Sequence, residues 1–277
     1  MKKGFTLIEL LVAISILAVA LSIAGVIFRV SIESHRAASA NAEVMQKLRA
    51  ITDQLNADFK GLISTSPGRV SFNVSGNIRS DCIAFLANGD FQSTRQYWYK
   101  KSDGTKALKT VSGNVASIFY GQAADLEPAI DPNIDPNSGD PKEKILLRRQ
   151  TILTADPDLQ DSGSALGEYF KFSLSQWDAN SPFPNIDAWT ARPPINPNDL
   201  GPNVVMYMAK GVDNFTIQFA EWDNLAGKYR WAPEIPQEFG KYEGGITTRA
   251  FKFTFTLYDS KGIIKTGRTF THIVYLD

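Results

Sequence analysis

The amino-acid sequence predicts an α+β fold, in which one long N-terminal α-helix packs against an antiparallel β-sheet body. Two observations predict it. Residues 5–63 contain no Pro and have the pattern of one helix, apolar on all sides at first and on one side later. From residue 64 onward that pattern stops, and short aromatic and β-branched runs alternate with clusters of Gly, Pro, Asn and Asp, which is typical of strands and turns.

Residues 5–28 are an apolar run whose only ionisable side chain is Glu9. A helix of this length spans a hydrocarbon core of ~30 Å, so we expect a transmembrane segment. The run is longer than the ~7 to 15 apolar residues of a secretory signal peptide. Because Lys2 and Lys3 precede the run, the N-terminus is expected in the cytoplasm and the body on the far side of the membrane.

The helix is expected to continue past the apolar run, through residues 29–63, as an amphipathic segment. One apolar stripe recurs there at steps of three and four residues: Val44, Leu48, Ile51, Leu55, Phe59 and Leu62. The helix is therefore expected to end near residue 63, with Ser22 and Gly25 as points where it can bend. This gives four segments: residues 1–4, the transmembrane residues 5–28, the amphipathic residues 29–63, and the β-rich body of residues 64–277.

Residues 3–12, KGFTLIELLV, resemble the class III signal of type IV pilins and type II secretion pseudopilins. The resemblance implies that a prepilin peptidase cuts between Gly4 and Phe5 and methylates the new amine of Phe5. It also implies that Glu9 contacts the N-terminal amine of a neighbouring subunit in a helical filament.

A physical argument supports that role for Glu9. An unpaired carboxylate inside a membrane costs ~2.5 to 3.5 kcal/mol, and such residues usually pair within a bundle. Pairing with the ammonium group of Phe5 from another subunit removes both charges from lipid and sets the register between subunits. The alternative is that Glu9 extends to the cytoplasmic headgroups, which its shallow position permits.

The body is expected to contain ten strands, of which residues 250–259 alternate most clearly. Phe251, Phe253, Phe255 and Leu257 share one face there, so this strand is expected to pack on the apolar stripe of the helix. The other expected strands are residues 69–74, 82–87, 96–100, 117–121, 144–153, 169–174, 203–212, 214–222 and 268–276.

Three stretches of the body resemble the J-type minor pseudopilins of type II secretion: residues 145–153, residues 211–236, and residues 251–262 together with 268–277. The resemblance implies a minor pseudopilin at or near the tip of a periplasmic pseudopilus, anchored in the bacterial inner membrane. Its partners would be other minor pseudopilins, the major pseudopilin and the inner-membrane secretion platform. The alternative is a minor type IV pilin that acts in pilus assembly, adhesion or DNA uptake.

Two segments rich in Pro, Asn and Asp, residues 125–143 and 181–203, are expected to be surface loops. In the first, Asp131, Asp135 and Asp140, together with Asp125, are weak candidates for a calcium site, since Ca²⁺ takes oxygen ligands. The EF-hand spacing is absent, and the prolines there suit turns. A solvated loop is therefore the preferred interpretation, and no cofactor is expected.

The chemistry-bearing residues favour a structural protein over an enzyme. The only histidines, His35 and His272, lie on an expected helix and an expected strand, and no zinc spacing or phosphate-binding loop occurs. The single cysteine, Cys82, lies in an apolar run and is expected to be a buried structural thiol. Lys plus Arg and Asp plus Glu both number 29, and this balance speaks against nucleic-acid binding.

Trp222, Tyr229 and Trp231 form an aromatic group near the end of the chain. Such residues can form a sugar-binding platform, but a cluster in the core is the preferred interpretation.

Overall fold

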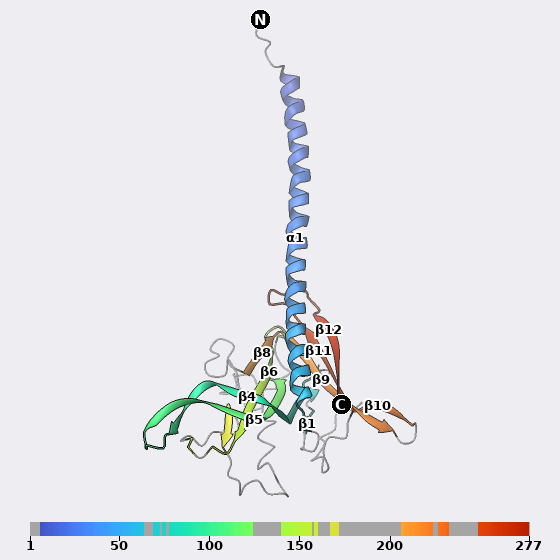
Figure 1. Ribbon diagram of the computed structural model, residues 1–277. Coiled ribbons are helices and arrows are strands. Elements are labelled where there is room, and N and C mark those ends of the chain that lie inside the picture. The colour runs from blue at the N-terminus through green and yellow to red at the C-terminus, as the bar shows by residue number, and fades with distance from the viewer. Residues whose placement is uncertain are drawn as a thin grey trace.

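A long helix stands out from a β-rich body in the computed structural model, with the N-terminus at the far end of the helix (Figure 1). The structure describes residues 6–63, 69–72, 74–75, 78–123, 140–156, 158–159, 167–171, 206–223, 227–232 and 249–276. The protein therefore has the α+β, pilin-like architecture that the sequence predicts.

Helix α1 (Leu7–Lys60) has 54 residues and runs through Ser22 and Gly25 without interruption, so neither position breaks it. At about 1.5 Å per residue it is roughly 80 Å long. The helix ends three residues earlier than predicted, because the chain joins a sheet there: Ile63 donates to the carbonyl of Leu86 (2.9 Å), and Asn88 donates to that of Gly61 (2.7 Å). A Cβ at Gly61 would overlap the carbonyl oxygen of Asn88, so this junction requires glycine.

Twelve strands follow α1 among the described residues: β1 (Arg69–Ser71), β2 (Val74–Ser75), β3 (Ile78–Arg79), β4 (Cys82–Lys100), β5 (Lys106–Gln122), β6 (Ile145–Thr154), β7 (Tyr169–Lys171), β8 (Tyr207–Lys210), β9 (Val212–Asp223), β10 (Lys228–Ala232), β11 (Ala250–Leu257) and β12 (Arg268–Tyr275). One sheet has the order β1-β4-β5-β6-β7, and β8 also pairs with β6. A second has the order β10-β9-β11-β12, and β2 pairs with β3.

The four-stranded sheet packs its apolar face on the C-terminal half of α1, as predicted. The predicted face of β11 is buried in one cluster with Val44, Ile51, Leu55 and Phe59 of the helix stripe. The ring of Phe59 lies 5.2 Å from that of Phe251 and 5.5 Å from that of Phe253. The other two members of the stripe, Leu48 and Leu62, are partly buried against the same cluster.

The six-stranded sheet is mostly antiparallel, as predicted, but one of its strand pairs is parallel. Strand β7 runs parallel to β6, with Ile152 opposite Tyr169. Residues 155–168 connect the two strands, and a connection of that length can carry the chain back along β6 so that β7 runs in the same direction.

Two of the predicted strands, residues 82–87 and 96–100, are parts of the single 19-residue strand β4. The polar residues between them hide its continuity in the sequence, and in the structure the pairing with β5 shifts register there. Strand β5 is also much longer than the predicted residues 117–121, so β4 and β5 form a hairpin that projects from the body (Figure 1).

The remaining strand predictions differ in detail. Of the predicted strand 203–212, residues 203–205 lie outside the described residues, residues 207–210 form β8, and residue 212 begins β9. Strands β3 and β10 were not predicted from the pattern. Of residues 169–174 only the first three are described, and they form β7.

Candidate functional site

The first turn of α1 is closed by a reciprocal pair of hydrogen bonds between Thr6 and Glu9. The Glu9 carboxylate accepts from the backbone N–H of Thr6 (2.9 Å) and from its hydroxyl (3.0 Å), while the Thr6 hydroxyl accepts from the N–H of Glu9 (3.3 Å). This capping box satisfies N–H groups that a helix start leaves without partners. It also holds the carboxylate beside Thr6, one residue from the predicted new N-terminus at Phe5.

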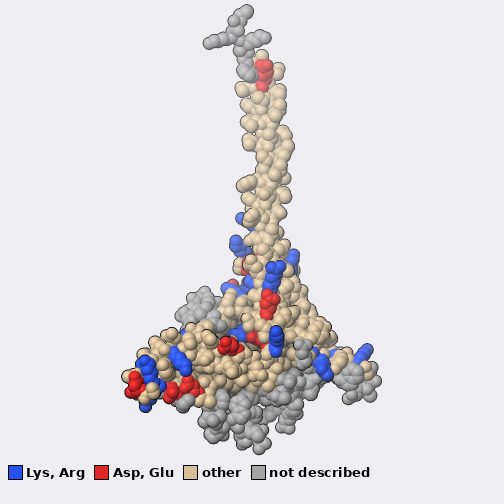
Figure 2. All heavy atoms as spheres, viewed as in Figure 1, with Lys and Arg blue, Asp and Glu red and all other residues tan. Residues whose placement is uncertain are grey.

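Beyond this cap, α1 exposes its apolar side chains all round. Leu7 is 75% exposed and Phe28 is 69% exposed, and the large apolar residues between them are at least half exposed. In Figure 2 this part of the helix is covered by uncharged side chains, apart from one acidic residue near its end. By length and composition α1 is able to cross a membrane.

The polar groups along this segment are satisfied within the helix. The hydroxyl of Ser15 donates to the carbonyl of Leu11 (2.8 Å), and that of Ser22 donates to the carbonyl of Ala18 (2.9 Å). Both hydroxyls therefore tolerate an apolar environment. The segment ends where Arg29 pairs with Glu33 (3.0 Å) on the exposed helix surface.

The structure describes only one of the three residues that were predicted for processing and assembly. Glu9 lies in the capping box, whereas Gly4 and Phe5 lie outside the described residues. The processing site and the pairing role of Glu9 therefore stay predictions.

The calcium candidates are also divided. Asp131 and Asp135, like Asp125, lie outside the described residues. Asp140 begins a turn, where its carboxylate accepts from the N–H of Lys142 (3.0 Å) and its carbonyl accepts from the N–H of Glu143 (2.8 Å). Within the described ranges no group of three or more His, Cys, Asp or Glu side chains is placed to hold a metal ion. Calcium binding stays an untested prediction.

The structure also shows the surroundings of Cys82, His272 and part of the aromatic group. Cys82 is a buried thiol, as predicted. Nε2 of His272 lies 2.9 Å from the amide oxygen of Asn56 on α1, so this nitrogen carries the hydrogen. The interpretation of the aromatic group as a core cluster was wrong for Tyr229, which is half exposed on β10; Trp231 is partly exposed, with the Lys252 ammonium 4.9 Å from its ring.

One buried polar group, which is centred on Asp58, was not predicted from the sequence. Asp58, in the last turn of α1, accepts two hydrogen bonds from Arg148 on β6 and one from the hydroxyl of Tyr120 on β5. The signal that could have revealed it is the pair Arg148 and Arg149 inside the apolar run of residues 145–153, since a strand buried on both faces holds a charge only with a partner.

Residues 1–25 match the protein family described as the prokaryotic N-terminal methylation motif. No curated protein and no solved structure matches the chain. The motif and the exposed apolar helix support a membrane-anchored, type IV pilin-like protein, and they suggest a structural rather than an enzymatic protein. The motif also implies processing by a prepilin peptidase and assembly with other pilin-like subunits.

Proposed function

We propose that the chain is a minor pseudopilin, a structural subunit at or near the tip of the type II secretion pseudopilus that supports initiation of the filament and protein export across the outer membrane. The observation that carries the proposal is the methylation motif at residues 1–25, continued by an apolar helix that is exposed all round. An apolar surface of this size needs either lipid or other helices to cover it. In a protein that moves from the membrane into a filament, lipid covers this surface first and other helices cover it later.

In this proposal the chain enters the inner membrane with its N-terminus in the cytoplasm and its body in the periplasm. Prepilin peptidase cuts between Gly4 and Phe5 and methylates the amine of Phe5. The Glu9 carboxylate then pairs with the Phe5 ammonium of the adjacent subunit, while the apolar parts of the helices pack together. Opposite charges of this kind are strongly attracted where water is excluded.

The proposed J-type identity rests on the resemblance of three stretches of the body. Those stretches contribute β6, β9, β10, β11 and β12, and the last four of these strands form the sheet that packs on α1. The body is also broad, with the β4–β5 hairpin projecting well to one side of the helix axis (Figure 1). Such a body is accommodated most easily at a filament tip, where neighbouring subunits lie on one side only.

The second candidate is a minor type IV pilin, which the same motif supports. Its adhesive version would use the exposed body. Its DNA-uptake version is disfavoured by the balance of 29 cations and 29 anions, because DNA binding depends on phosphate neutralisation by Lys and Arg.

Deletion of the gene in its own host separates the two candidates. We expect export of secreted proteins to stop while twitching and surface attachment persist, and re-expression of the full chain to restore export. The opposite pattern would favour the minor pilin, and a deletion without effect on either process would contradict both. Co-purification of the full chain in detergent with the other minor pseudopilins of the host tests the proposed partners.

A further inference from the structure

The outer part of the β4–β5 hairpin, residues 92–112, forms an arm that projects from the body (Figure 1). We call it the hairpin arm. After a register shift between Gln92 and Gln96, its strands pair regularly from Gln96 opposite Thr110 to Lys100 opposite Lys106. Successive side chains of a strand point to opposite faces, so the arm has two faces with different residues.

One face of the hairpin arm is fixed to the body. The rings of Tyr97 and Tyr169 lie edge to face with centroids 4.7 Å apart, and Tyr97 and Tyr99 pack against the buried cluster that includes Leu159. The backbone N–H of Lys100 donates to the carbonyl of Asp158 (2.8 Å). This face is therefore covered by the chain itself.

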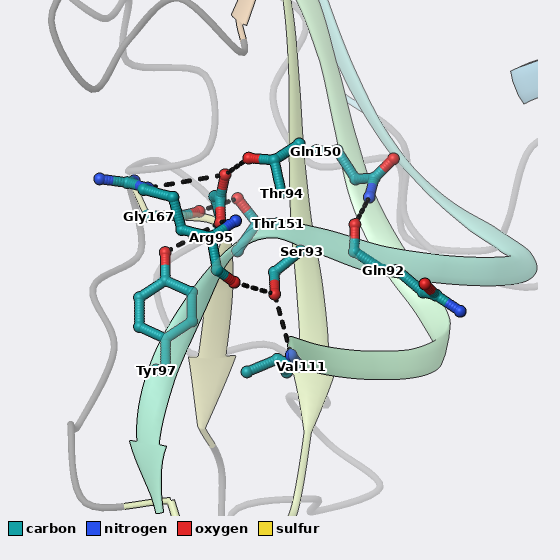
Figure 3. A network of polar contacts seen from close by, with 10 residues as sticks. Gln92, Ser93, Thr94, Arg95, Tyr97, Val111, Gln150, Thr151 and Gly167 are labelled. Carbon is teal, nitrogen blue, oxygen red and sulfur yellow. Dashed lines mark hydrogen bonds and ion pairs between the residues drawn. The ribbon is translucent and has the colours of Figure 1, made fainter. Parts of the chain in front are cut away.

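The base of the arm is held by the buried carboxylate of Glu168. It accepts hydrogen bonds from the hydroxyl of Thr94, from the N–H of Arg95 (3.2 Å) and from the hydroxyl of Tyr97 (3.0 Å) (Figure 3). Burial and the hydrogen bond to Glu168 raise the pKa of Tyr97 to about 12, so its hydroxyl remains a donor at neutral pH.

Ser93 completes the base on the other side. Its hydroxyl accepts from the N–H of Val111 (2.8 Å) and donates to the carbonyl of Arg95 (2.7 Å), as Figure 3 shows. These hydrogen bonds hold the register shift in place, so the arm is ordered before any partner arrives. A preorganised surface loses little conformational entropy on binding.

The opposite face of the hairpin arm is apolar at its centre. Trp98 and Leu108 lie directly opposite each other across the two strands, and they are 49% and 50% exposed. A Trp that is ordered by its strand yet half exposed is the residue type that most often dominates a protein–protein interface. The flanking pairs on this face are Gln96 with Thr110 and Lys100 with Lys106.

Charge is divided between the two faces. On the side of the body, Lys109 pairs with Asp156 (3.2 Å), and Arg95 lies 3.7 Å from the Glu168 carboxylate. At the tip, Asp103 is engaged by the N–H and hydroxyl of Thr105. Lys100 and Lys106 have no ion-pair partner among the residues that the structure describes. The exposed face therefore combines an apolar centre with the two lysines Lys100 and Lys106.

We propose that the Trp98–Leu108 face of the hairpin arm is a docking surface for an acidic segment of another protein. An apolar side chain of that segment packs on Trp98 and Leu108, and its carboxylates pair with Lys100 and Lys106. Charges at the rim of an interface steer association and select the partner, whereas the buried aromatic centre supplies most of the affinity. This surface is distinct from the apolar helix, so the proposal does not depend on the type of filament.

Two other classes of partner fit less well. The hairpin arm lies at the body end of α1, and the amphipathic residues 29–60 separate it from the membrane segment by roughly 45 Å at ~1.5 Å per residue (Figure 1). Two lysines also add only ~1 kcal/mol each at an anionic lipid surface. Nucleic-acid binders neutralise more phosphates than two lysines can reach.

The test uses the full chain in its own host, with the photo-crosslinking residue p-benzoylphenylalanine incorporated at Leu108. We expect illumination to give an adduct with a peptide of another protein, and mass spectrometry to show that the peptide carries net negative charge. The double substitution Lys100→Glu with Lys106→Glu should lower the adduct yield about tenfold, because it turns the attraction into repulsion.

The matched control is Lys228→Glu with Arg268→Glu, which reverses two exposed charges on the other sheet and should leave the yield unchanged. Protection of Cys82 from a thiol reagent reports that each variant is folded, since this thiol is buried. No adduct, an adduct with lipid, with nucleic acid or with a second copy of this chain, an adduct with a non-acidic peptide, or equal yields from the two double variants would each overturn the proposal.

Discussion

Asp58 and Arg148 join the last turn of α1 to the six-stranded sheet through two parallel hydrogen bonds. Nε of Arg148 lies 2.6 Å from Oδ2 of Asp58, and Nη2 lies 2.7 Å from Oδ1. Gln54 donates to the same carboxylate (3.1 Å), and so does Tyr120, whose pKa is raised by burial and by the charge of Asp58. A planar pair of this kind fixes both position and rotation, so the helix is locked in register with the body.

Replacing one partner of this pair should destabilise the body strongly. Arg148→Met keeps the apolar stem but leaves the Asp58 carboxylate buried without its counter-charge, and we expect the free energy of unfolding to fall by about 3 kcal/mol. Denaturant titration of the full chain in detergent, followed by tryptophan fluorescence, measures it. Tyr120→Phe is the milder comparison and should cost about 1 kcal/mol, one hydrogen bond.

The double variant Asp58→Leu with Arg148→Met removes both charges and should recover much of the loss. A single Arg148→Met variant as stable as the original chain would show that the ion pair does not hold the helix in place.

Gly61 should be irreplaceable at the junction of helix and sheet. In Gly61→Ala the new methyl group would overlap the carbonyl of Asn88, so the helix end must separate from β4, and we expect a loss of about 2 to 3 kcal/mol. Gly25→Ala is the matched control, because a Cβ there meets no atom within 4 Å. Unfolding of both variants in detergent gives the comparison, and equal stabilities would contradict the close approach.

The sequence was sufficient to predict those parts of the fold that a local pattern determines. The stripe from Val44 to Phe59 and the alternation from Phe251 to Leu257 each predict a buried face, and these two faces are the ones that meet. Both are set by period and polarity alone, which any short window of sequence contains.

Features that depend on distant residues were not predictable in this way. The continuity of β4 through its polar middle depends on Glu168, more than seventy residues away. The pairing of Asp58 depends on Arg148 at a separation of 90 residues. Adjacent Arg148 and Arg149 point to opposite faces of β6, one to the helix carboxylate and the other to the ring of Phe119 at 4.9 Å. No local window shows which partner each one finds.

His272 should make the body less stable in mild acid. Burial lowers the pKa of His272, and the charge of Asp53 only partly opposes this. The folded state therefore favours the neutral ring. Its contribution to stability is present above the unfolded pKa of ~6.5 and is lost as the pH falls through the folded pKa.

Unfolding free energies measured at about pH 7.5 and about pH 5 test this dependence. His272→Gln, which keeps a donor toward Asn56 but cannot titrate, should show a smaller decrease on acidification than the original chain. An NMR titration should place the His272 midpoint below the value of an unfolded peptide, and a higher midpoint would contradict the effect of burial.

Gly4→Val should prevent removal of the first four residues. The expected peptidase has to accommodate the residue before the cut, and a branched side chain adds bulk beside the bond between Gly4 and Phe5. The measurement is the mass of the chain recovered from membranes, with Gly25→Ala as a control that should be processed normally. Recovery of mature chain from the Gly4→Val variant would contradict the proposed processing.

Glu9 permits the sharpest distinction between a local and an assembly role. Its carboxylate closes the capping box with Thr6, but a Gln at the same position forms this motif as well. If Glu9 served only as a cap, or only reached the headgroups, Glu9→Gln would assemble normally. Pairing with the ammonium of a neighbouring Phe5 requires the negative charge, so we expect Glu9→Gln and Glu9→Val to insert in the membrane at normal levels but to enter filaments poorly.

Thr6→Val, which removes the hydroxyl but not the charge, should assemble far better than either. The readout is the fraction of the chain in sheared or cross-linked filaments relative to the membrane pool, and normal incorporation of Glu9→Gln would refute the charge-pairing role.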